Sequence, residues 1–321
     1  RSGEDRGYIA YNDIYLLNDA QDSCHRLNGI ASEYATVEFN QITSNYRNNN
    51  WAFNAGSNDT LRYNTAINLS HGITAENDSD TYIENNNINV ECAGIYIPNG
   101  DGMHSILNNT FTTIDGSTCG DYAIQATNMD NIIIEGNIFS GSFGNGFYVN
   151  NTGADISGNL IETRGKGIYL ENQAGSIVKN NTFISVDGGD FGAYITELSS
   201  PAIYSNIFQG FNTGIYIDND LVSTEIRNNN LWMITEDDFS GTAMPPLIGQ
   251  YVSENNNGDP TDIYANMSLD PLFNDDYTIP LDSPCVNAGL SSILDDDGTI
   301  SDIGYYNYPI NIIINHDIIF W

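Results

Sequence analysis

The chain has 321 residues, long enough to bury a sizeable core in one large domain or two smaller ones. Nine Lys and Arg against 42 Asp and Glu give a formal net charge of −33, and such a surface repels nucleic-acid phosphates and anionic lipids. No apolar run approaches the ~18 residues that a membrane-spanning helix needs. We therefore expect no nucleic-acid partner and no membrane span.

From about residue 7 the chain repeats itself with a period near 22 residues. Weak copies begin at Gly7, Gly29 and Ala52, and Asn18 falls 22 residues before Asn40. The residue three positions before each aligned asparagine is always Val, Leu or Ile. The aligned asparagines, at spacings of 24, 22, 23, 28, 22, 22, 25 and 23 residues, are Asn40, Asn64, Asn86, Asn109, Asn137, Asn159, Asn181, Asn206 and Asn229.

A second motif runs in phase with the first, 13 to 15 residues ahead of each asparagine. It reads GITA, GIYI, AIQA, GFYV, GIYL, GAYI and GIYI between residues 72 and 217. The simplest structure for short alternating strands that end in Gly or Asn at this period is a coil. In such a coil each strand pairs in parallel with its copy one turn later. At a strand spacing of ~4.8 Å, about ten coils build a prism roughly 48 Å long. The sequence therefore predicts an all-β parallel solenoid.

The segment NIIIEGNIF, residues 131–139, indicates how one corner forms. Ile134 and Phe139 are expected to point into the core, and Gly136-Asn137 to make the corner because Asn tolerates a left-handed backbone. Stacked asparagine amides would hydrogen-bond in a ladder, since each buried amide left unpaired costs ~1–3 kcal/mol. We therefore interpret the aligned asparagines as structural.

These columns resemble the right-handed parallel β-helix repeats of the pectate-lyase-like superfamily, with their asparagine ladder. DPLFNDDYTIPLDSPCVNAG (270–289) and DDDGTISDIGYY (295–306) are similar to the closing segment of secreted bacterial surface β-helix proteins. The resemblance implies an extracellular or cell-surface location. We expect coils over residues 1–232, the last coils and an irregular closing segment over 233–308, and an apolar tail over 309–321. The family includes enzymes and proteins without catalysis, so the residues must decide the activity.

Four cysteines are sparse for this length. Cys92 and Cys119 lie about one repeat apart and are the favoured disulfide pair. The alternative is that the cysteines are small buried apolar residues.

Two groups of side chains are candidates for catalysis, although no catalytic residue is assigned. Arg164 and Lys166 flank one corner, and either a base beside a cation site or a surface salt bridge fits them. The carboxylates of Glu171, Glu197 and Asp218 occupy nearly the same slot on consecutive coils. The outer two would be roughly 9.6 Å apart, near the upper limit for inverting glycosidases. Because like charges in a column repel one another, a solvated acidic edge is the simpler interpretation.

The outward position of the GIYI motif carries a tyrosine stripe. It consists of Tyr96 and, on four successive coils, of Tyr148, Tyr169, Tyr194 and Tyr216. Such a stripe could bind the sugar rings of a polysaccharide or another protein chain. The alternative is that tyrosine is a good strand residue that stacks on itself.

One acidic turn is a candidate metal site. LDDDGTISD, residues 294–302, offers carboxylates from Asp295, Asp297 and Asp302 around a glycine, but lacks the bidentate Glu of an EF-hand. A solvated turn is the simpler interpretation. We expect no required cofactor, and Ca²⁺ is the ion that this turn would bind.

The last segment, YPINIIINHDIIFW, is apolar and strongly β-prone. A β-solenoid exposes unpaired backbone groups at each end, which the tail of one copy could cover on the next. We therefore predict a non-catalytic extracellular structural or adhesive protein that assembles head to tail. The alternatives are a tail folded along its own solenoid, a carbohydrate-binding surface module, and a polysaccharide lyase or glycoside hydrolase. The tail residues predicted to mediate assembly are Ile310, Ile312, Ile314, Ile318, Phe320 and Trp321.

Overall fold

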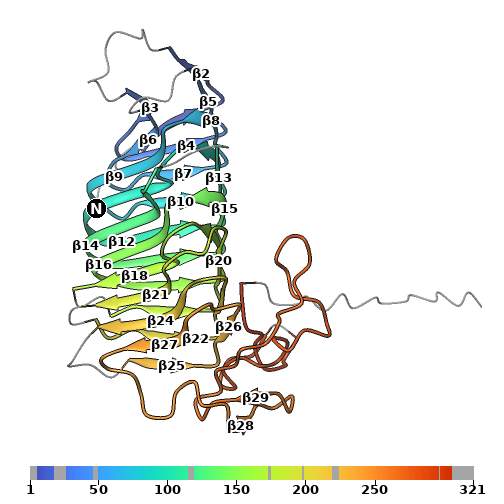
Figure 1. The fold of residues 1–321 in the computed structure, drawn as a ribbon. Helices are drawn as coiled ribbons and strands as arrows, with labels where there is room; N and C mark the ends of the chain where they lie inside the picture. Colours follow the sequence, from blue (N-terminus) through green and yellow to red (C-terminus); the bar gives the residue numbers. More distant parts are fainter. Residues whose placement is uncertain are drawn as a thin grey trace, which may run out of the picture.

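The computed structural model describes residues 6–17, 27–45, 50–114, 119–172, 175–196, 199–218, 224–295 and 297–305. Over these ranges the chain winds as a solenoid whose turns each contain three strand positions, here named the first, second and third columns (Figure 1). Among the described residues no helix is long and apolar enough to cross a membrane. The predicted tail, 309–321 with its six assembly residues, lies outside the described ranges.

The first and second columns together form a 17-stranded sheet. Strands β12, β14 and β16 run through both columns without a break. The first column contains β3 (Leu27–Ala31), β6 (Asn50–Ala55), β9 (His71–Ser79), β12 (Ile95–Leu107), β14 (Tyr122–Glu135), β16 (Asn145–Ser157), β18 (Ile168–Glu171), β21 (Phe191–Thr196), β24 (Thr213–Asp218) and β27 (Asp237–Gly241). The second column adds β1 (Gly7–Ala10), β4 (Ala35–Glu38), β7 (Thr60–Arg62), β10 (Tyr82–Glu84), β19 (Ile177–Lys179), β22 (Ala202–Tyr204) and β25 (Glu225–Arg227).

The third column is a separate ten-stranded sheet. Every pairing within the two large sheets joins a strand in parallel to its copy one turn later, as β17 pairs with β20. The third-column strands are β2 (Asp13–Leu16), β5 (Gln41–Ser44), β8 (Thr65–Leu69), β11 (Asn87–Val90), β13 (Thr110–Thr113), β15 (Ile138–Phe143), β17 (Leu160–Thr163), β20 (Thr182–Ser185), β23 (Ile207–Gln209) and β26 (Asn230–Trp232).

The solenoid makes about eight turns rather than the expected ten. The expected number counted every copy of the repeat, whereas the end coils are incomplete. Among the described residues β1 and β2 have no first-column strand before them, and β27 leads into the closing segment instead of another turn. The parallel β-solenoid itself is confirmed.

Alternation along each strand builds the core. In β18, Ile168 and Leu170 are fully buried while Tyr169 between them is half-buried on the outside. The residues three positions before the ladder asparagines are all buried, and rings stack behind them, with Phe183 and Phe208 centred 5.2 Å apart. Because each turn repeats the same side chain at the same place, the core is a set of continuous columns.

The corner between the second and third columns differs from the prediction in one respect. The left-handed residue is not the ladder asparagine but the residue before it, such as Asn108 (φ 54°), Gly136 (φ 66°) or Asn180 (φ 50°). The preceding residue turns the chain, which leaves the ladder asparagine free to direct its amide along the solenoid axis.

The asparagine ladder is continuous through the solenoid. Asn159 Oδ1 accepts the backbone N–H of Asn137 at 2.9 Å and its Nδ2 at 3.0 Å. Asn159 Nδ2 in turn donates to Asn181 Oδ1 at 2.9 Å and to the carbonyls of Ile134 and Ser157. Every amide hydrogen of such a rung has an acceptor, so the rungs can be fully buried.

Both ends of the ladder were missed in the sequence. Asn12 donates to Asn40 Oδ1 at 2.8 Å and is the first rung among the described residues, and Asn18 lies outside them. Asn229 donates to Asn266 Oδ1 at 3.1 Å, and Asn266 N donates to buried Asp262 at 2.9 Å. The separation of 37 residues from Asn229 to Asn266 departs from the period, so this rung could not be recognised from the repeat.

The closing segment after β27 packs back along the solenoid. Its described residues contain one antiparallel strand pair, β28 (Ser253–Glu254) with β29 (Pro260–Thr261), take part in two isolated bridges, and otherwise form turns and irregular loops. Gly304 N donates to the carbonyl of Ser205 at 2.9 Å, so the segment reaches coils that lie well before it in sequence. A second small core forms between it and the third column, with Ile207, Met267, Ile279, Cys285, Ala288 and Ile303.

Candidate functional site

The tyrosine stripe lies on the outer face of the first column. The strand register aligns Tyr148 with Tyr169, Tyr169 with Tyr194, and Tyr194 with Tyr216 on consecutive turns. Tyr96 belongs to the same row, but Gln125 stands between it and Tyr148. The stripe is therefore four tyrosines in a row, followed by a polar gap and a fifth ring.

The rings of the stripe contact one another along its length. Their centroids lie 5.0 Å apart for Tyr148 and Tyr169, 5.1 Å for Tyr169 and Tyr194, and 5.3 Å for Tyr194 and Tyr216. The first two pairs are tilted by 40° and 61°, so the neighbouring rings do not cover each other's faces completely. Mutual packing leaves each tyrosine half-buried and holds it in one orientation.

Glu171, at the end of β18, orders the hydroxyl groups of the stripe. Its carboxylate accepts hydrogen bonds from the hydroxyls of Tyr148 and Tyr169, the second at 2.8 Å, and from Asn150 Nδ2 at 3.0 Å. Burial and then this hydrogen bond raise the pKa of Tyr148 to about 12. The pKa of Tyr169 is likewise raised to about 12, chiefly by burial. Both tyrosines are therefore neutral hydrogen-bonding groups at ordinary pH.

A cation lies against the middle of the stripe. The amino group of Lys166 is 5.4 Å from the ring centroid of Tyr194, 5.8 Å from that of Tyr169 and 6.0 Å from that of Phe191. Arg164, its partner in the catalytic hypothesis, donates instead to the carbonyl of Cys119 at 3.2 Å. Lys166 therefore contacts aromatic rings, whereas Arg164 contacts a backbone carbonyl.

A hollow of about 230 Å³ adjoins the stripe where Gln125 interrupts it. Trp51 and Tyr96 lie on one side of it, tilted by 38° with centroids 6.3 Å apart, and Tyr122 lies on the other, stacked on Tyr148 at 5.1 Å. Gln125 and Asp121 add polar groups to its lining. Trp51 and Tyr122 were missed in the sequence because they lie outside the repeated tyrosine position.

The acidic column proposed for catalysis has a different composition. The register pairs Thr196 with Asp218, so Thr196 and not Glu197 lies beside Asp218, and Glu197 itself is outside the described residues. Thr196 is buried and Asp218 is exposed. With Glu171 already bound by three donors, a catalytic role for these side chains remains a prediction.

The three aspartates predicted to bind calcium are engaged in turns. Asp297 accepts the N–H and the hydroxyl of Thr299, both at 2.7 Å, which lowers the pKa of Asp297. Asp302 accepts the N–H of Asn287 at 2.7 Å, and Asp295 accepts that of Asp302 at 3.1 Å. Among the described residues this trio is not a group whose ligand atoms converge within 4.8 Å. Calcium at this turn remains a prediction.

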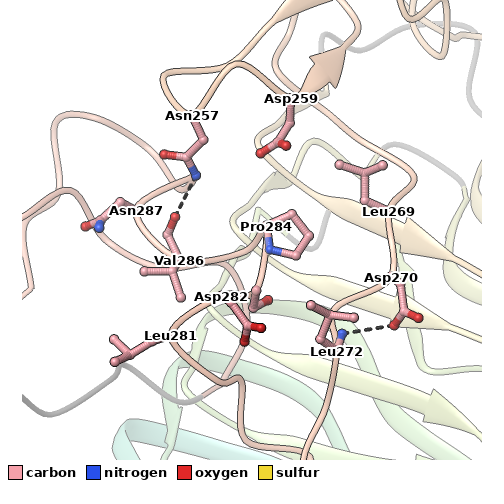
Figure 2. Close-up of a pocket in the computed structure, with 11 residues that line it drawn as sticks. Asn257, Asp259, Leu269, Asp270, Leu272, Leu281, Asp282, Pro284, Val286 and Asn287 are labelled. Carbon is pink, nitrogen blue, oxygen red and sulfur yellow. Dashed lines mark hydrogen bonds between the residues drawn. The ribbon is translucent and has the colours of Figure 1, made fainter.

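A larger hollow, of about 580 Å³, lies within the closing segment (Figure 2). Three of its carboxylates belong to Asp259, Asp270 and Asp282. Asp270 caps a turn through the N–H of Leu272 at 2.9 Å, and Asn257 spans the rim to the carbonyl of Val286 at 2.8 Å. These contacts stabilise loops, so we place the candidate site on the stripe.

A family model described as the right handed beta helix region matches residues 112–235. The solenoid is a right-handed β-helix. The match covers the four consecutive tyrosines of the stripe, and it confirms the resemblance drawn from the repeats. The comparison with curated proteins gives no match. Right-handed β-helices occur in structural and in polysaccharide-active proteins, so the fold does not choose between them.

Proposed function

We propose that this β-helix is a non-catalytic, extracellular adhesive protein whose tyrosine stripe binds an extended neutral polysaccharide. The observation that carries the proposal is the row of half-exposed rings and ordered hydroxyls on one face of a rigid sheet. Successive rings lie 5.0 to 5.3 Å apart, so consecutive units of a glycan chain can each meet a ring and a hydroxyl group. Aromatic and polar groups held in place lose little freedom on binding.

The net charge of −33 decides the class of glycan. Polymers of uronic acids would be repelled by the surface, and Lys166 is a single cation within the stripe. A neutral chain has no such penalty. Its hydroxyls can bond to Asn150, Glu171 and the tyrosine hydroxyls, and the hollow beside Gln125 has room for one ring.

A binding role accounts for Glu171 better than catalysis does. A general acid needs a proton to give, whereas the carboxylate of Glu171 accepts from three donors. The contacts of Glu171 position the hydroxyls of the stripe.

Calorimetric titration of the whole protein with neutral hexasaccharides of glucose, xylose and N-acetylglucosamine tests the proposal. Tyr169→Ala should weaken binding at least about tenfold, or about 1.4 kcal/mol. Tyr82→Ala, an outward tyrosine on the second column, is the matched control and should bind normally. The proposal fails if no neutral glycan binds, if polygalacturonate binds more tightly, or if both variants lose affinity equally. Release of new reducing ends or unsaturated products would restore the enzyme alternative.

A second candidate function, head-to-tail assembly, is favoured by the first coil. Tyr8, Tyr15 and Leu17 are 62%, 69% and 75% exposed there. Within the described ranges, β1 and β2 pair only with β4 and β5, and the second edge of each strand is where a strand of another copy could add. Deleting residues 310–321 and measuring mass by light scattering tests whether the tail joins copies. Assembly requires that the intact chain forms oligomers and the shortened chain does not.

A further inference from the structure

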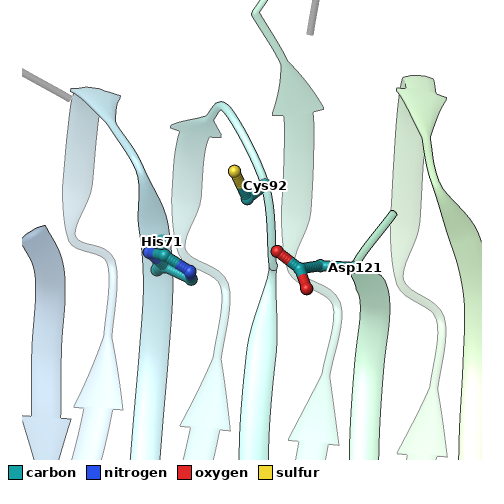
Figure 3. A group of neighbouring side chains, drawn as sticks. All are labelled: His71, Cys92 and Asp121. Carbon is teal, nitrogen blue, oxygen red and sulfur yellow. The ribbon is translucent and has the colours of Figure 1, made fainter. Parts of the chain in front are cut away.

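Three potential metal ligands meet at the start of the first column. His71 begins β9, Cys92 lies in the turn after β11, and Asp121 immediately precedes β14, so the three come from consecutive turns (Figure 3). One ligand atom of each lies within 4.8 Å of the other two. His71 and Cys92 are half-buried and Asp121 is exposed, which leaves the group accessible to ions.

A fourth donor is attached to this group. Cys92 and Cys119 form a disulfide, the pair favoured from their spacing, with their Cα atoms 5.2 Å apart. A disulfide sulfur is a poor ligand, but the thiolates that reduction produces are strong ligands for zinc. Reduction would therefore leave two thiols, one imidazole and one carboxylate as neighbours, with Cys119 next to the group through its former partner Cys92.

The hydrogen bonds of Ser70 orient the imidazole for this role. The Ser70 hydroxyl lies 2.7 Å from the carbonyl of Asn50 and 2.7 Å from His71 Nδ1, so in the arrangement in which it donates its one proton to the carbonyl it accepts from Nδ1. The neutral ring then carries its lone pair on Nε2. Trp51 stacks on the imidazole at 4.5 Å and fixes its plane. Such a partner on the second nitrogen is the usual support of a metal-binding histidine.

We propose that the Cys92–Cys119 disulfide and a zinc ion are alternative occupants of one site, with His71 and Asp121 as the other two ligands. Four ligands of these types form a tetrahedral zinc site, in which neighbouring ligand atoms are about 3.3 to 3.8 Å apart. The ligand atoms of His71, Cys92 and Asp121 need to contract by about 1 Å from their 4.8 Å upper limit, and the Cys119 sulfur, which is not one of these three atoms, needs to move toward them once the S–S bond is broken. The acidic surface attracts the cation, and zinc neutralises two of the three negative charges that the ligands would carry.

The replacement of the disulfide by zinc takes two steps, reduction and then metal binding. With a trialkylphosphine, the S–S bond breaks, water supplies its oxygen to the phosphine and its two protons to the sulfurs, and phosphine oxide leaves. Zinc binding then releases both thiol protons to solvent as two thiolates form.

Cobalt(II), a spectroscopic substitute for zinc, tests the proposal in the full chain with Cys24→Ser, which removes the thiol outside the described residues. Cys285 is kept because it is buried and its pKa is raised to about 12. The phosphine-reduced protein should bind one cobalt per chain, with tetrahedral d–d bands and a thiolate charge-transfer band. The oxidised protein should show neither. Zinc should displace the cobalt.

Two ligand variants distinguish cobalt bound at this site from cobalt bound nonspecifically elsewhere on the protein. Asp121→Asn, an exposed change that preserves shape, and His71→Ala should each weaken cobalt binding at least about tenfold, while Glu236→Gln should not change it. The proposal is overturned if oxidised and reduced protein bind cobalt equally, or if both ligand variants bind like the parent. His71 and Asp121 also line the hollow beside Gln125, but the readout is the metal spectrum of protein without glycan, so its outcome does not depend on glycan binding.

Discussion

The asparagine ladder and the tyrosine stripe are both columns of one residue type repeated turn after turn. The ladder rungs are buried, and each amide donates and accepts along the axis. The stripe tyrosines are half-buried, and the hydroxyls of Tyr148 and Tyr169 bond to the side chain of Glu171 at the surface. The same register produced both columns, but only the ladder is fully satisfied by its own repetition.

This difference separates a structural repeat from a binding repeat. A rung of the ladder has no capacity for an outside partner, since its donors and acceptors are used within the solenoid. A stripe ring keeps part of its face and edge in solvent. Repetition alone therefore does not indicate a binding function. Repeated side chains that keep contact surface or hydrogen-bonding groups open to solvent do indicate one.

Replacing a central rung should have the largest effect on stability. Asn159→Ala removes the three hydrogen bonds that Asn159 Nδ2 donates and leaves the buried N–H and Nδ2 of Asn137 without their shared acceptor. We expect a loss of about 4 kcal/mol, given ~1–3 kcal/mol for each buried group left unpaired. Urea unfolding followed by circular dichroism measures it.

Asn12→Ala at the described start of the ladder is the control and should cost about 1 kcal/mol, because Asn12 is exposed. Equal losses at the two positions would contradict the claim that burial gives the ladder its importance.

The glycine that opens six of the seven copies of the GIYI motif, with Ala123 as the exception, should be nearly as sensitive. A Cβ on Gly146 would lie 1.9 Å from the carbonyl oxygen of Gly167 on the next turn, and this contact is with backbone. Gly146→Ala should therefore cost about 3 kcal/mol through strain between turns. Gly175→Ala is the control, because nothing lies within 4 Å of its added Cβ. Thermal unfolding measures both variants. Melting temperatures that fall equally would show that the close approach of the next turn's backbone is not the reason for glycine.

Most of the fold could be predicted because the repeated residues show how consecutive turns align. A period near 22 residues and an invariant apolar residue three positions before Asn are enough to stack the turns. Asn12 was not found in this way because Asn18, 22 residues before Asn40, fits the period better than Asn12 at 28 residues, and Asn266 was missed because its 37-residue separation from Asn229 departs from the period. Their positions are set by contacts that only the folded chain makes.

The candidate site was predictable only where it repeats. The tyrosine row follows from alternation, but Trp51, Tyr122 and the hollow beside Gln125 depend on how three turns pack. The grouping of His71 with Asp121 was missed for the same reason, although Cys92 and Cys119 were paired correctly by their spacing. Single residues that meet once along a solenoid leave no periodic signal.

Truncating the stripe should affect stability much less than truncating the ladder. Tyr194→Ala removes ring contacts with Tyr169, Tyr216 and Phe191 and the cation contact with Lys166. We expect a loss of about 1 to 2 kcal/mol, since part of the ring is already in solvent. Urea unfolding measures it beside Asn159→Ala. A loss as large as that of Asn159→Ala would make the stripe a structural column like the ladder.

The smallest effect on stability, and the sharpest test of the stripe's order, comes from Glu171→Gln. Glutamine keeps the shape and can still accept from Tyr148 and Tyr169, but it removes the charge that helps to hold their hydroxyls protonated. The pKa of each tyrosine should fall from about 12 part of the way toward 10, because burial, the larger cause, remains. Titration of tyrosinate absorbance measures this shift.

The sign of the accompanying change in stability follows from the raised pKa values. Protonated Tyr148 and Tyr169 stabilise the fold fully below pH 10, and this contribution is lost as pH rises from 10 to about 12. In Glu171→Gln the stability lost between pH 10 and about 12 should be smaller, while the free energy of unfolding at pH 7 should change little. If the tyrosines titrate identically in both proteins, Glu171 does not order the stripe, and the hydroxyl row is set by ring packing alone.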